Sequence, residues 1–305
     1  MIDTPYHKQA ELLLRVLPFI DKEAVFALKG GTAINFFFRD LPRISVDIDL
    51  TYLPIRDRDS SFHEISDALI RISGDIEGRI PGTKIISKKI KGTSLLNALF
   101  IKLQNAGIKI EPNLVLRGAV LPTERRMISS KALNIFGISM ECRTLSENEL
   151  YAGKICAALD RQHPRDLFDV YMLFKVSGFT STMRKVFIVY LISHDRPMVE
   201  LLNPGLSDIR SVFETEFKDM TLESVTCEDL EKTREELIAM ILKELTIQEK
   251  QFIVSVKEGT PKWDLLGLEG IENLPAVKWK LMNIGKMNPS KHEKSVRKLK
   301  DCLQL

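Results

Sequence analysis

Two aspartates two residues apart, Asp47 and Asp49, lie in an otherwise apolar run, and Asp47 stands sixteen residues after Gly31 of a Gly30-Gly31 pair. Within a β-strand, side chains at positions i and i+2 project from the same face, so the two carboxylates would lie side by side. Paired carboxylates supply the hard oxygen ligands that Mg²⁺ shares with phosphate groups. Glycine has no Cβ and lets the backbone approach a ligand closely. The combination indicates a site for magnesium and a nucleotide.

The elements expected around these residues favour that interpretation. Residues 25–28 form a short apolar run that predicts a strand, and residues 32–38 predict a helix that begins just after the glycines. Backbone N–H groups at the start of a helix attract anions such as phosphate, and Thr32 adds a hydroxyl at the same place. Residues 45–51 predict the strand that carries both aspartates.

A third carboxylate is usually needed to hold two metal ions beside a nucleotide, and Glu111 is the candidate. Residues 108–116 predict a strand whose alternation places Lys109 and Glu111 on one face, with isoleucines on the other. The alternative, in which Glu111 is an exposed residue of an edge strand, stays open from the pattern alone.

A second dense group of charges comprises Lys154 and the later residues Arg165, Asp166 and Asp169. On a helix, residues three or four apart share a face, which pairs Asp166 with Asp169 and Arg165 with Asp169. Lysine is suited to a phosphate as a compact point charge, and apolar neighbours would place Lys154 next to the core. The alternative is a solvated helical face with intrahelical ion pairs.

The composition is ordinary for a soluble globular protein. The chain has 305 residues, a net charge of +3 and four widely separated cysteines, so a disulfide framework or zinc knuckle is not expected and a reducing cytoplasm fits. We find no signal peptide and no apolar run long enough to span a membrane. The chain shows no phosphate-binding P-loop motif, which argues against a P-loop kinase or ATPase.

The secondary-structure pattern of the sequence changes near residue 145. Strand signals dominate before it and helical runs after it, so we expect a mixed α/β domain over residues 1–145 and a helical domain over residues 146–305. In the first part, we also predict a helix over residues 60–79 and strands over residues 84–90, 95–103 and 135–140, the last of which would close the sheet.

Taken together, these motifs resemble those of the AbiEii/AbiGii abortive-infection toxins, which belong to the polymerase-β-like nucleotidyltransferase superfamily. The resemblance covers residues 25 to about 175, and its residues are Gly30-Gly31-Thr32, Arg43-x-Ser45-x-Asp47-Ile48-Asp49-Leu50, Glu111, Lys154 and Arg165-Asp166-x-x-Asp169. It implies an α+β fold, in which an N-terminal nucleotidyltransferase mixed sheet flanked by helices precedes a helical C-terminal domain.

The resemblance also implies a role for each motif residue. The nucleotide phosphates would be held by Gly30, Gly31, Thr32 and Ser45. Mg²⁺ would be bound by Asp47, Asp49 and Glu111, although aspartate is commoner than glutamate at the third position. Lys154 would contact the triphosphate, and Arg165 would either help there or be structural. The late motif would be completed by Asp166 and Asp169, one as a base or orienting group and the other structural.

In this interpretation an NTP donates a nucleotidyl group to an acceptor hydroxyl and releases pyrophosphate. Related toxins use the 3′ end of tRNA as the acceptor and thereby block translation, and the resemblance implies a cognate antitoxin as a partner. Two alternatives remain: transfer to a small molecule or to a protein hydroxyl, and a non-catalytic module that binds NTP or nucleic acid.

An RNA acceptor requires a basic surface, because phosphate contacts supply much of the affinity. The chain has three basic runs, namely Lys84, Lys88, Lys89 and Lys91; Arg117, Arg125, Arg126 and Lys131; and eight cations between Lys278 and Lys300. We expect the second run to lie in a loop. An ordinary solvated lysine-rich helix, or an acidic antitoxin, would also account for the third. Trp263 and Trp279 are expected to pack between the C-terminal helices.

Overall fold

The computed structural model describes residues 5–305, and its chain forms two compact units. The first unit runs to Leu150 and also contains Asp219–Ser224, and the second comprises Tyr151–Lys218 and Val225–Leu305. Because the short segment at Asp219–Ser224 returns to the first unit from far along the chain, the two units are not simple consecutive halves of the sequence.

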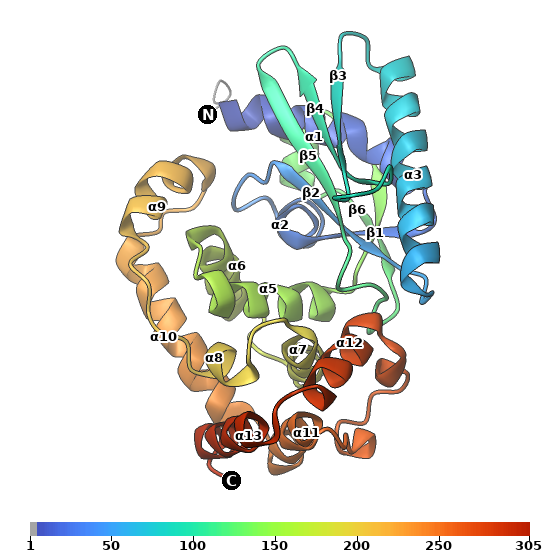
Figure 1. The fold of residues 1–305 in the computed structure, drawn as a ribbon. Helices are drawn as coiled ribbons and strands as arrows, with labels where there is room; N and C mark the ends of the chain where they lie inside the picture. Colours follow the sequence, from blue (N-terminus) through green and yellow to red (C-terminus); the bar gives the residue numbers. More distant parts are fainter. Residues whose placement is uncertain (1–4) are drawn as a thin grey trace. The chain divides into compact units, whose positions relative to one another are not determined.

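A seven-stranded mixed sheet forms the centre of the first unit, with the strand order β3-β4-β5-β2-β1-β7-β6 (Figure 1). Strand β2 lies in the middle and pairs antiparallel with β1 and parallel with β5. The strands are β1 (Phe26–Lys29), β2 (Asp47–Tyr52), β3 (Lys84–Lys89), β4 (Leu96–Leu103), β5 (Ala106–Asn113), β6 (Glu124–Met127) and β7 (Glu141–Thr144). The strand with the paired aspartates therefore lies at the most enclosed position in the sheet.

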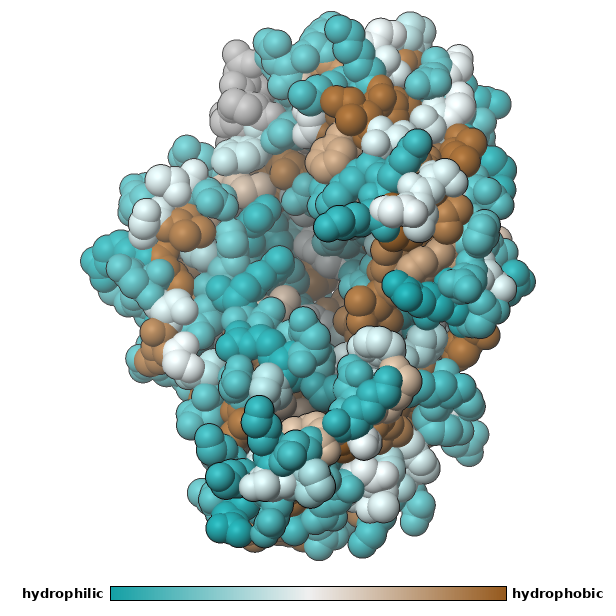
Figure 2. Space-filling view, viewed as in Figure 1, coloured by the Kyte–Doolittle hydropathy of each residue, from teal (hydrophilic) through white to brown (hydrophobic). Residues whose placement is uncertain are grey.

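Two long helices pack on one face of this sheet. Helix α1 (Pro5–Asp21) packs on β5, and α3 (Arg58–Arg79) packs on β4. The buried residues of β4 alternate, since Leu99 and Ile101 are fully enclosed whereas Phe100 between them is only half-buried. The helices therefore cover the face of Leu99 and Ile101, and Phe100 belongs to the opposite face. Figure 2 shows hydrophobic side chains among hydrophilic ones on the part of the surface over β3 to β5.

The glycine pair opens a short helical segment. Helix α2 (Gly30–Ala33) follows β1 directly and continues as the π-helical turn η1 (Ile34–Phe38). A π-helical turn is rare and is frequently found at functional sites. The expected helix over residues 32–38 is thus confirmed as a helical segment, but its second half is wound more widely than an α-helix.

The prediction that residues 135–140 form the closing strand is wrong. The chain instead forms helix α4 (Ser130–Phe136), because Ser129 caps its N-terminus by accepting a hydrogen bond from the Ala132 N–H. Gly137, with φ of +66°, ends the helix in the left-handed conformation that glycine adopts at little cost. The sheet is closed instead by β6 and β7, which pair with each other.

The segment Asp219–Ser224 lies against the loop that precedes β2. The Ile44 N–H donates to the carbonyl of Met220, the Leu222 N–H donates to the carbonyl of Pro42, and Arg43 pairs with Thr221 between them. These backbone contacts fix the loop from which the Arg43 side chain extends.

The second unit is built from helices around a buried apolar core (Figure 1). Its helices are the end of α5 (Glu147–Arg161), α6 (Pro164–Val176), α7 (Ser181–Ser193), α8 (Met198–Leu202), α9 (Arg210–Glu216), α10 (Cys227–Glu244), α11 (Ile247–Glu258), α12 (Pro275–Gly285) and α13 (Pro289–Leu303). Helices α10 and α11 each begin with a capping box, at Thr226 and Thr246.

Only one of the two tryptophans is packed. Trp263 lies 5.8 Å from the ring of Phe252, measured between centroids, whereas Trp279 on α12 is 59% exposed. The prediction that Trp279 packs between helices is therefore wrong, since the buried face of α12 is provided by Ala276, Val277 and Ile284. None of the helices in residues 5–305 combines the length and apolar character needed to cross a membrane.

We predict that Glu149→Ala destabilises the first unit. The buried Glu149 carboxylate accepts hydrogen bonds from the N–H groups of Val120 at 2.9 Å and Leu121 at 3.0 Å, so its loss leaves two donors unpaired. The free energy of unfolding should fall by about 2–4 kcal/mol, as measured by urea unfolding. Glu141→Ala is the matched control, because Glu141 is exposed and its ion pair with Arg125 is half-solvated, so its effect should stay within about 1 kcal/mol.

Candidate active site

The Asp49 carboxylate packs against Gly30 at the start of α2. A Cβ placed on Gly30 would lie 2.5 Å from Asp49 Oδ2, and Gly30 has φ of +72°. No side chain fits at that distance, and L residues rarely adopt that backbone conformation. We expected the glycine pair to leave room for a ligand, but the space beside Gly30 is taken by the acid itself.

Gly31 makes the equivalent contact with a cation. A Cβ at this position would lie 2.5 Å from a terminal nitrogen of Arg43 and 3.2 Å from Ser45 Oγ. Arg43 is only 2% exposed and donates a hydrogen bond to the carbonyl of Ile44. The two glycines therefore seat one carboxylate and one guanidinium close to the backbone of the same turn.

The hydroxyl of Thr32 ties this turn to strand β2. Thr32 Oγ1 lies 2.5 Å from the carbonyl oxygen of Asp47 and 3.0 Å from Ser45 Oγ, and the side chains of Thr32 and Ser45 are buried. Thr32 and Ser45 thus hold the start of β2 against α2. Their hydroxyls are engaged within the protein, which is typical of residues that support the acidic strand.

The sheet register brings the third predicted acid beside the first two. Asp49 lies directly opposite Glu111 on the neighbouring parallel strand, and Asp47 lies opposite Lys109. Residues opposite each other in a sheet share a face, so all four side chains project from the same side. Lys109 forms an ion pair with Glu111 on that face, where the Glu111 side chain is 41% exposed.

This donor set fits a hard divalent cation in chemical type. Asp47, Asp49 and Glu111 supply carboxylate oxygens from two adjacent strands, and Mg²⁺ is typically held by one or two carboxylates together with substrate phosphates. Among residues 5–305, no three acidic, histidine or cysteine side chains are already arranged as a metal site. Glu111 already has a cation as its partner, because Lys109 forms an ion pair with it.

The late motif forms a buried ion cluster in the second unit. Lys154 Nζ lies 2.7 Å from Asp166 Oδ1 and 3.0 Å from Asp169 Oδ2, and all three side chains are at most 7% exposed. Arg161 Nε lies 2.5 Å from Asp166 Oδ2 and adds a second positive charge. The solvated-face alternative is wrong for Lys154, Asp166 and Asp169, because these three side chains are buried where α5 and α6 meet, whereas the Arg161 side chain is 61% exposed. Arg165 is half-buried beside it.

The cations dominate the electrostatics of this cluster. Burial by itself would raise the pKa of Asp166, but Lys154 and Arg161 hold it well below its usual value. His163 caps helix α6 by accepting a hydrogen bond from the Arg165 N–H at 3.1 Å. Burial, and then the charge of Arg165, lower the pKa of His163. The cluster therefore keeps Asp166 as an anion beside Lys154.

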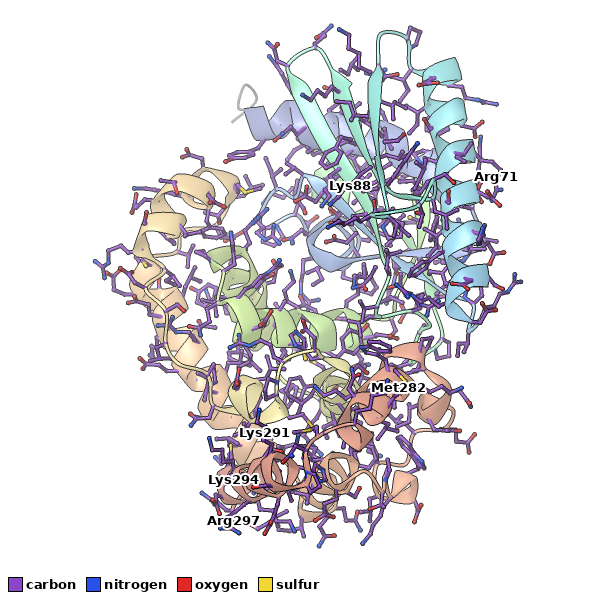
Figure 3. The ribbon with its side chains drawn as sticks, in the orientation of Figure 1. Arg71, Lys88, Met282, Lys291, Lys294 and Arg297 are labelled. Atoms are coloured by element: carbon purple, nitrogen blue, oxygen red, sulfur yellow. The ribbon has the colours of Figure 1, made fainter. Side chains whose placement is uncertain are left out.

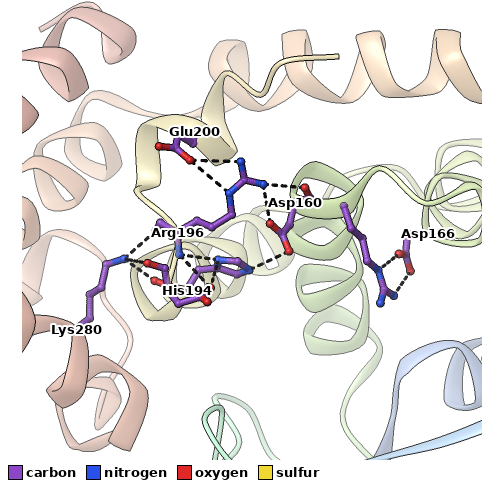
Figure 4. Close-up of polar contacts among 8 residues, drawn as sticks. Asp160, Asp166, His194, Arg196, Glu200 and Lys280 are labelled. Carbon is purple, nitrogen blue, oxygen red and sulfur yellow. Dashed lines mark hydrogen bonds and ion pairs between the residues drawn. The ribbon is translucent and has the colours of Figure 1, made fainter. Parts of the chain in front are cut away.

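A second polar network lies nearby in the same unit (Figure 4). Arg196 contacts Asp160 at 2.8 Å and Glu200 at 3.3 Å, while Lys280 donates to the carbonyls of His194 and Arg196 at 2.5 and 2.9 Å. Burial, together with the charge of Lys257, lowers the pKa of Lys280 to about 8. Lys280 thus caps the carbonyl end of α7 and is not part of an exposed basic surface.

The second basic run is largely engaged within the protein. Arg117 is 7% exposed, and burial lowers its pKa. Arg125 and Arg126 lie on strand β6, contrary to the expected loop, and pair with Glu141 and Glu124. In the third run, Lys291, Lys294 and Arg297 extend from α13 into solvent (Figure 3). In the first run, Lys84, Lys88, Lys89 and Lys91, on or next to β3, are all exposed.

The fold is similar to that of a solved toxin structure. MenT4, a nucleotidyltransferase toxin from Mycobacterium tuberculosis, superposes with a TM-score of 0.62 and 15% sequence identity, covering 92% of this chain and 93% of that one. The mixed sheet with its many helices is therefore a nucleotidyltransferase fold of this kind. Among curated proteins, none matches this chain in sequence.

The family assignment rests on the sequence. The family described as nucleotidyl transferase AbiEii toxin, type IV toxin–antitoxin system, matches residues 11–283. The chain belongs to this family of nucleotidyltransferase toxins. The resemblance drawn from the motifs is thereby confirmed.

The structure adds two residues to the predicted site, Arg43 and Lys109. The sequence carries a signal for each: Arg43 opens the motif that ends in the paired aspartates, and Lys109 shares the face of Glu111 by alternation. Neither signal identifies the partner, because Arg43 packs against a glycine twelve residues earlier and Lys109 neutralises an acid on its own strand.

We predict that Gly30→Ala lowers nucleotidyl transfer by at least about 100-fold, since a displacement of about 1 Å can cost this much. The added methyl group would meet Asp49 Oδ2 and force the carboxylate away. Gly74→Ala in helix α3 is the matched control, because a Cβ there meets nothing within 4 Å. The control should keep its activity and gain about 0.5–1 kcal/mol of stability in thermal unfolding. Equal activity of the two variants would contradict the geometry.

A third prediction concerns the pH dependence of stability. A carboxylate whose pKa is lowered by folding contributes stability above its unfolded pKa of about 4, and this contribution is lost as the pH falls toward the folded value. Because the pKa of Asp166 is lowered, Asp166→Asn should cost about 3 kcal/mol near pH 7 and progressively less below about pH 4. Urea unfolding from pH 7 to pH 3 measures this, with the exposed Asp264→Asn as control. A cost that does not change with pH would contradict the assignment.

Proposed function

We propose that this toxin transfers a nucleotidyl group from an NTP to the 3′-hydroxyl of tRNA and thereby blocks translation in the cytoplasm. The observation that supports the proposal is the placement of Asp47, Asp49 and Glu111 on one face of two adjacent strands, with Asp49 seated against Gly30. The family supplies the reaction class, and the acceptor is the finer step that we infer.

In the proposed reaction, the acceptor oxygen attacks the α-phosphorus of the NTP. A new P–O bond forms, the bond between the α- and β-phosphates breaks, and pyrophosphate leaves while the hydroxyl proton passes to a base. Bound Mg²⁺ would neutralise phosphate charge. Asp47, Asp49 and Glu111 would hold it, and Lys109 would release Glu111 and become free to pair with a phosphate. The protein contributes mainly positioning and charge neutralisation.

The other motif residues have proposed roles, except Arg165, which we leave as either a phosphate contact or a structural residue. Gly30 and Gly31 shape the turn that fixes Asp49 and Arg43, and Thr32 and Ser45 brace strand β2. We propose that Lys154 binds the triphosphate and that Asp166 and Asp169 set its position, because both carboxylates contact its ammonium group. We assign the nucleotidyltransferase domain to the first unit.

We also propose a cognate antitoxin, because the family consists of toxins of type IV toxin–antitoxin systems. Transfer to a small molecule or to a protein hydroxyl uses the same acids and the same donor. The paired carboxylates argue against a module that only binds nucleotide, since binding alone does not require them.

The test is transfer of label from each of four NTPs labelled at the α-phosphate, in Mg²⁺, with tRNA, total protein or buffer as acceptor. We expect label in the tRNA band with one or more NTPs, and a loss of at least about 100-fold in Asp49→Asn. Asp59→Asn, an exposed residue in the first turn of α3, is the control and should retain activity.

Label in protein or in a small product would replace tRNA as the acceptor while keeping the reaction class. Absence of transfer to any acceptor, or unchanged transfer by Asp49→Asn, would overturn the proposed chemistry.

A further inference from the structure

We propose that the open sheet face formed by β3, β4 and β5 binds the single-stranded 3′ end of the acceptor RNA. The proposal rests on the proposed function and adds the surface that would guide the acceptor to the acidic strand. Three observations support the proposal: the sheet register, the lysines on this face and one aromatic ring between them.

One continuous row of side chains leads from the acidic strand to the edge of the sheet. Asp47 lies opposite Lys109, Lys109 lies opposite Phe100, and Phe100 lies opposite Ile86 on edge strand β3. Directly opposed residues share a face. Lys109 Nζ lies 5.7 Å from the centre of the Phe100 ring, which shows that both side chains project from the same side.

The charges on this face are arranged to receive an anion. Lys84 lies directly opposite Lys102 on the neighbouring strand, and both side chains are exposed. Like charges directly opposed across a sheet are destabilising unless a counter-charge lies between them. Lys88 shares the face of Lys84, because it lies four residues along the same strand. Among the residues that the structure describes, neither Lys84, Lys88 nor Lys102 takes part in an ion pair.

An aromatic ring and an aliphatic side chain lie between these cations. Phe100 is half-buried, and Ile86 is 53% exposed. The corresponding area in Figure 2 has hydrophobic side chains among hydrophilic ones, and Lys88 is labelled on β3 in Figure 3. Surfaces that bind single strands combine cations for the backbone with aromatic rings on which bases stack.

Two other roles of this face, protection of the sheet edge and docking of a protein partner, explain fewer of its features than RNA binding does. Lysines on an edge strand protect a sheet against pairing with another sheet, but Lys102 and Lys109 lie on inner strands. A docking surface for a protein partner typically has few lysines at its centre. A nucleic acid strand uses both the cations and the ring, and its end would reach Asp47 along the row.

The test measures binding of fluorescently labelled tRNA by anisotropy at several salt concentrations. All variants carry Asp49→Asn, so that no turnover occurs. We expect Lys84→Ala with Lys102→Ala to weaken binding at least tenfold and to reduce the salt slope by about 0.7 per lysine. Phe100→Leu, which keeps the apolar volume but removes the stacking surface, should weaken binding about fivefold with an unchanged salt slope. The control is Arg79→Ala, an exposed cation on α3, which should bind as the parent does.

A parallel measurement of transfer to tRNA, with Asp49 intact, separates the two proposals. If the parent protein transfers label to tRNA and the β3–β5 variants bind and transfer as it does, the surface is wrong and the proposed function stands. If the parent transfers nothing to tRNA, the proposed function fails, and the binding data alone decide whether this face binds RNA. Loss of antitoxin binding with unchanged tRNA binding would assign the face to a protein partner and overturn the proposal.

Discussion

The close contact between the diglycine turn and two charged side chains is the constraint on which the rest of the site depends. A Cβ at Gly30 or Gly31 would come within 2.5 Å of Asp49 or Arg43, respectively. The turn can therefore be built only from glycine as long as both charged groups stay where they are. Strand β1 delivers the turn, and its antiparallel register places Lys29 opposite Asp49, so the turn and the acid lie at one end of the same strand pair.

This arrangement gives the glycines a different role from the one that their sequence suggests. A glycine next to a helix start is commonly read as space for a phosphate. Here the missing side chains first make room for the protein's own carboxylate and guanidinium. Contact with the backbone of the turn fixes the orientation of Asp49. Because glycine has no side chain, the turn loses no side-chain entropy in making this contact. A fixed orientation is useful for a carboxylate that must hold a metal ion.

The two charged clusters differ in the way their burial is compensated. In the second unit, Lys154, Asp166 and Asp169 are buried together, and their burial is tolerable because each carboxylate contacts the Lys154 ammonium group. Asp166 also contacts Arg161, whose side chain is mostly exposed. In the first unit, Glu111 is only half-shielded and has Lys109 as its partner on the open face. A fully neutralised core cluster favours a fixed arrangement, whereas a half-exposed pair can exchange its partner for a ligand.

The number of basic residues in a segment does not predict how basic its surface is. Lys280 belongs to the most basic stretch of the sequence, yet it is half-buried and donates to backbone carbonyls, with a pKa lowered to about 8. Arg125 and Arg126 are held by acids on their own sheet. Lys84 on β3 comes from a less prominent run and Lys102 on β4 from none, yet these two lie opposite each other across the strands without an ion-pair partner among the described residues.

The sequence by itself determined the shared face of Asp47 and Asp49 and most helix and strand positions, because periodicity and end signals act over a few residues. It also determined the reaction family, through the resemblance of its motifs to a known family. It misplaced residues 135–140, where the cap at Ser129 and the stop at Gly137 outweigh apolar content. Only the tertiary structure decided that Glu111 lies opposite Asp49, that Arg43 fills the space beside Gly31, and that Asp219–Ser224 rejoins the first unit. These contacts join residues that are distant in sequence, and their geometry is set by sheet order and close packing, which no local pattern encodes.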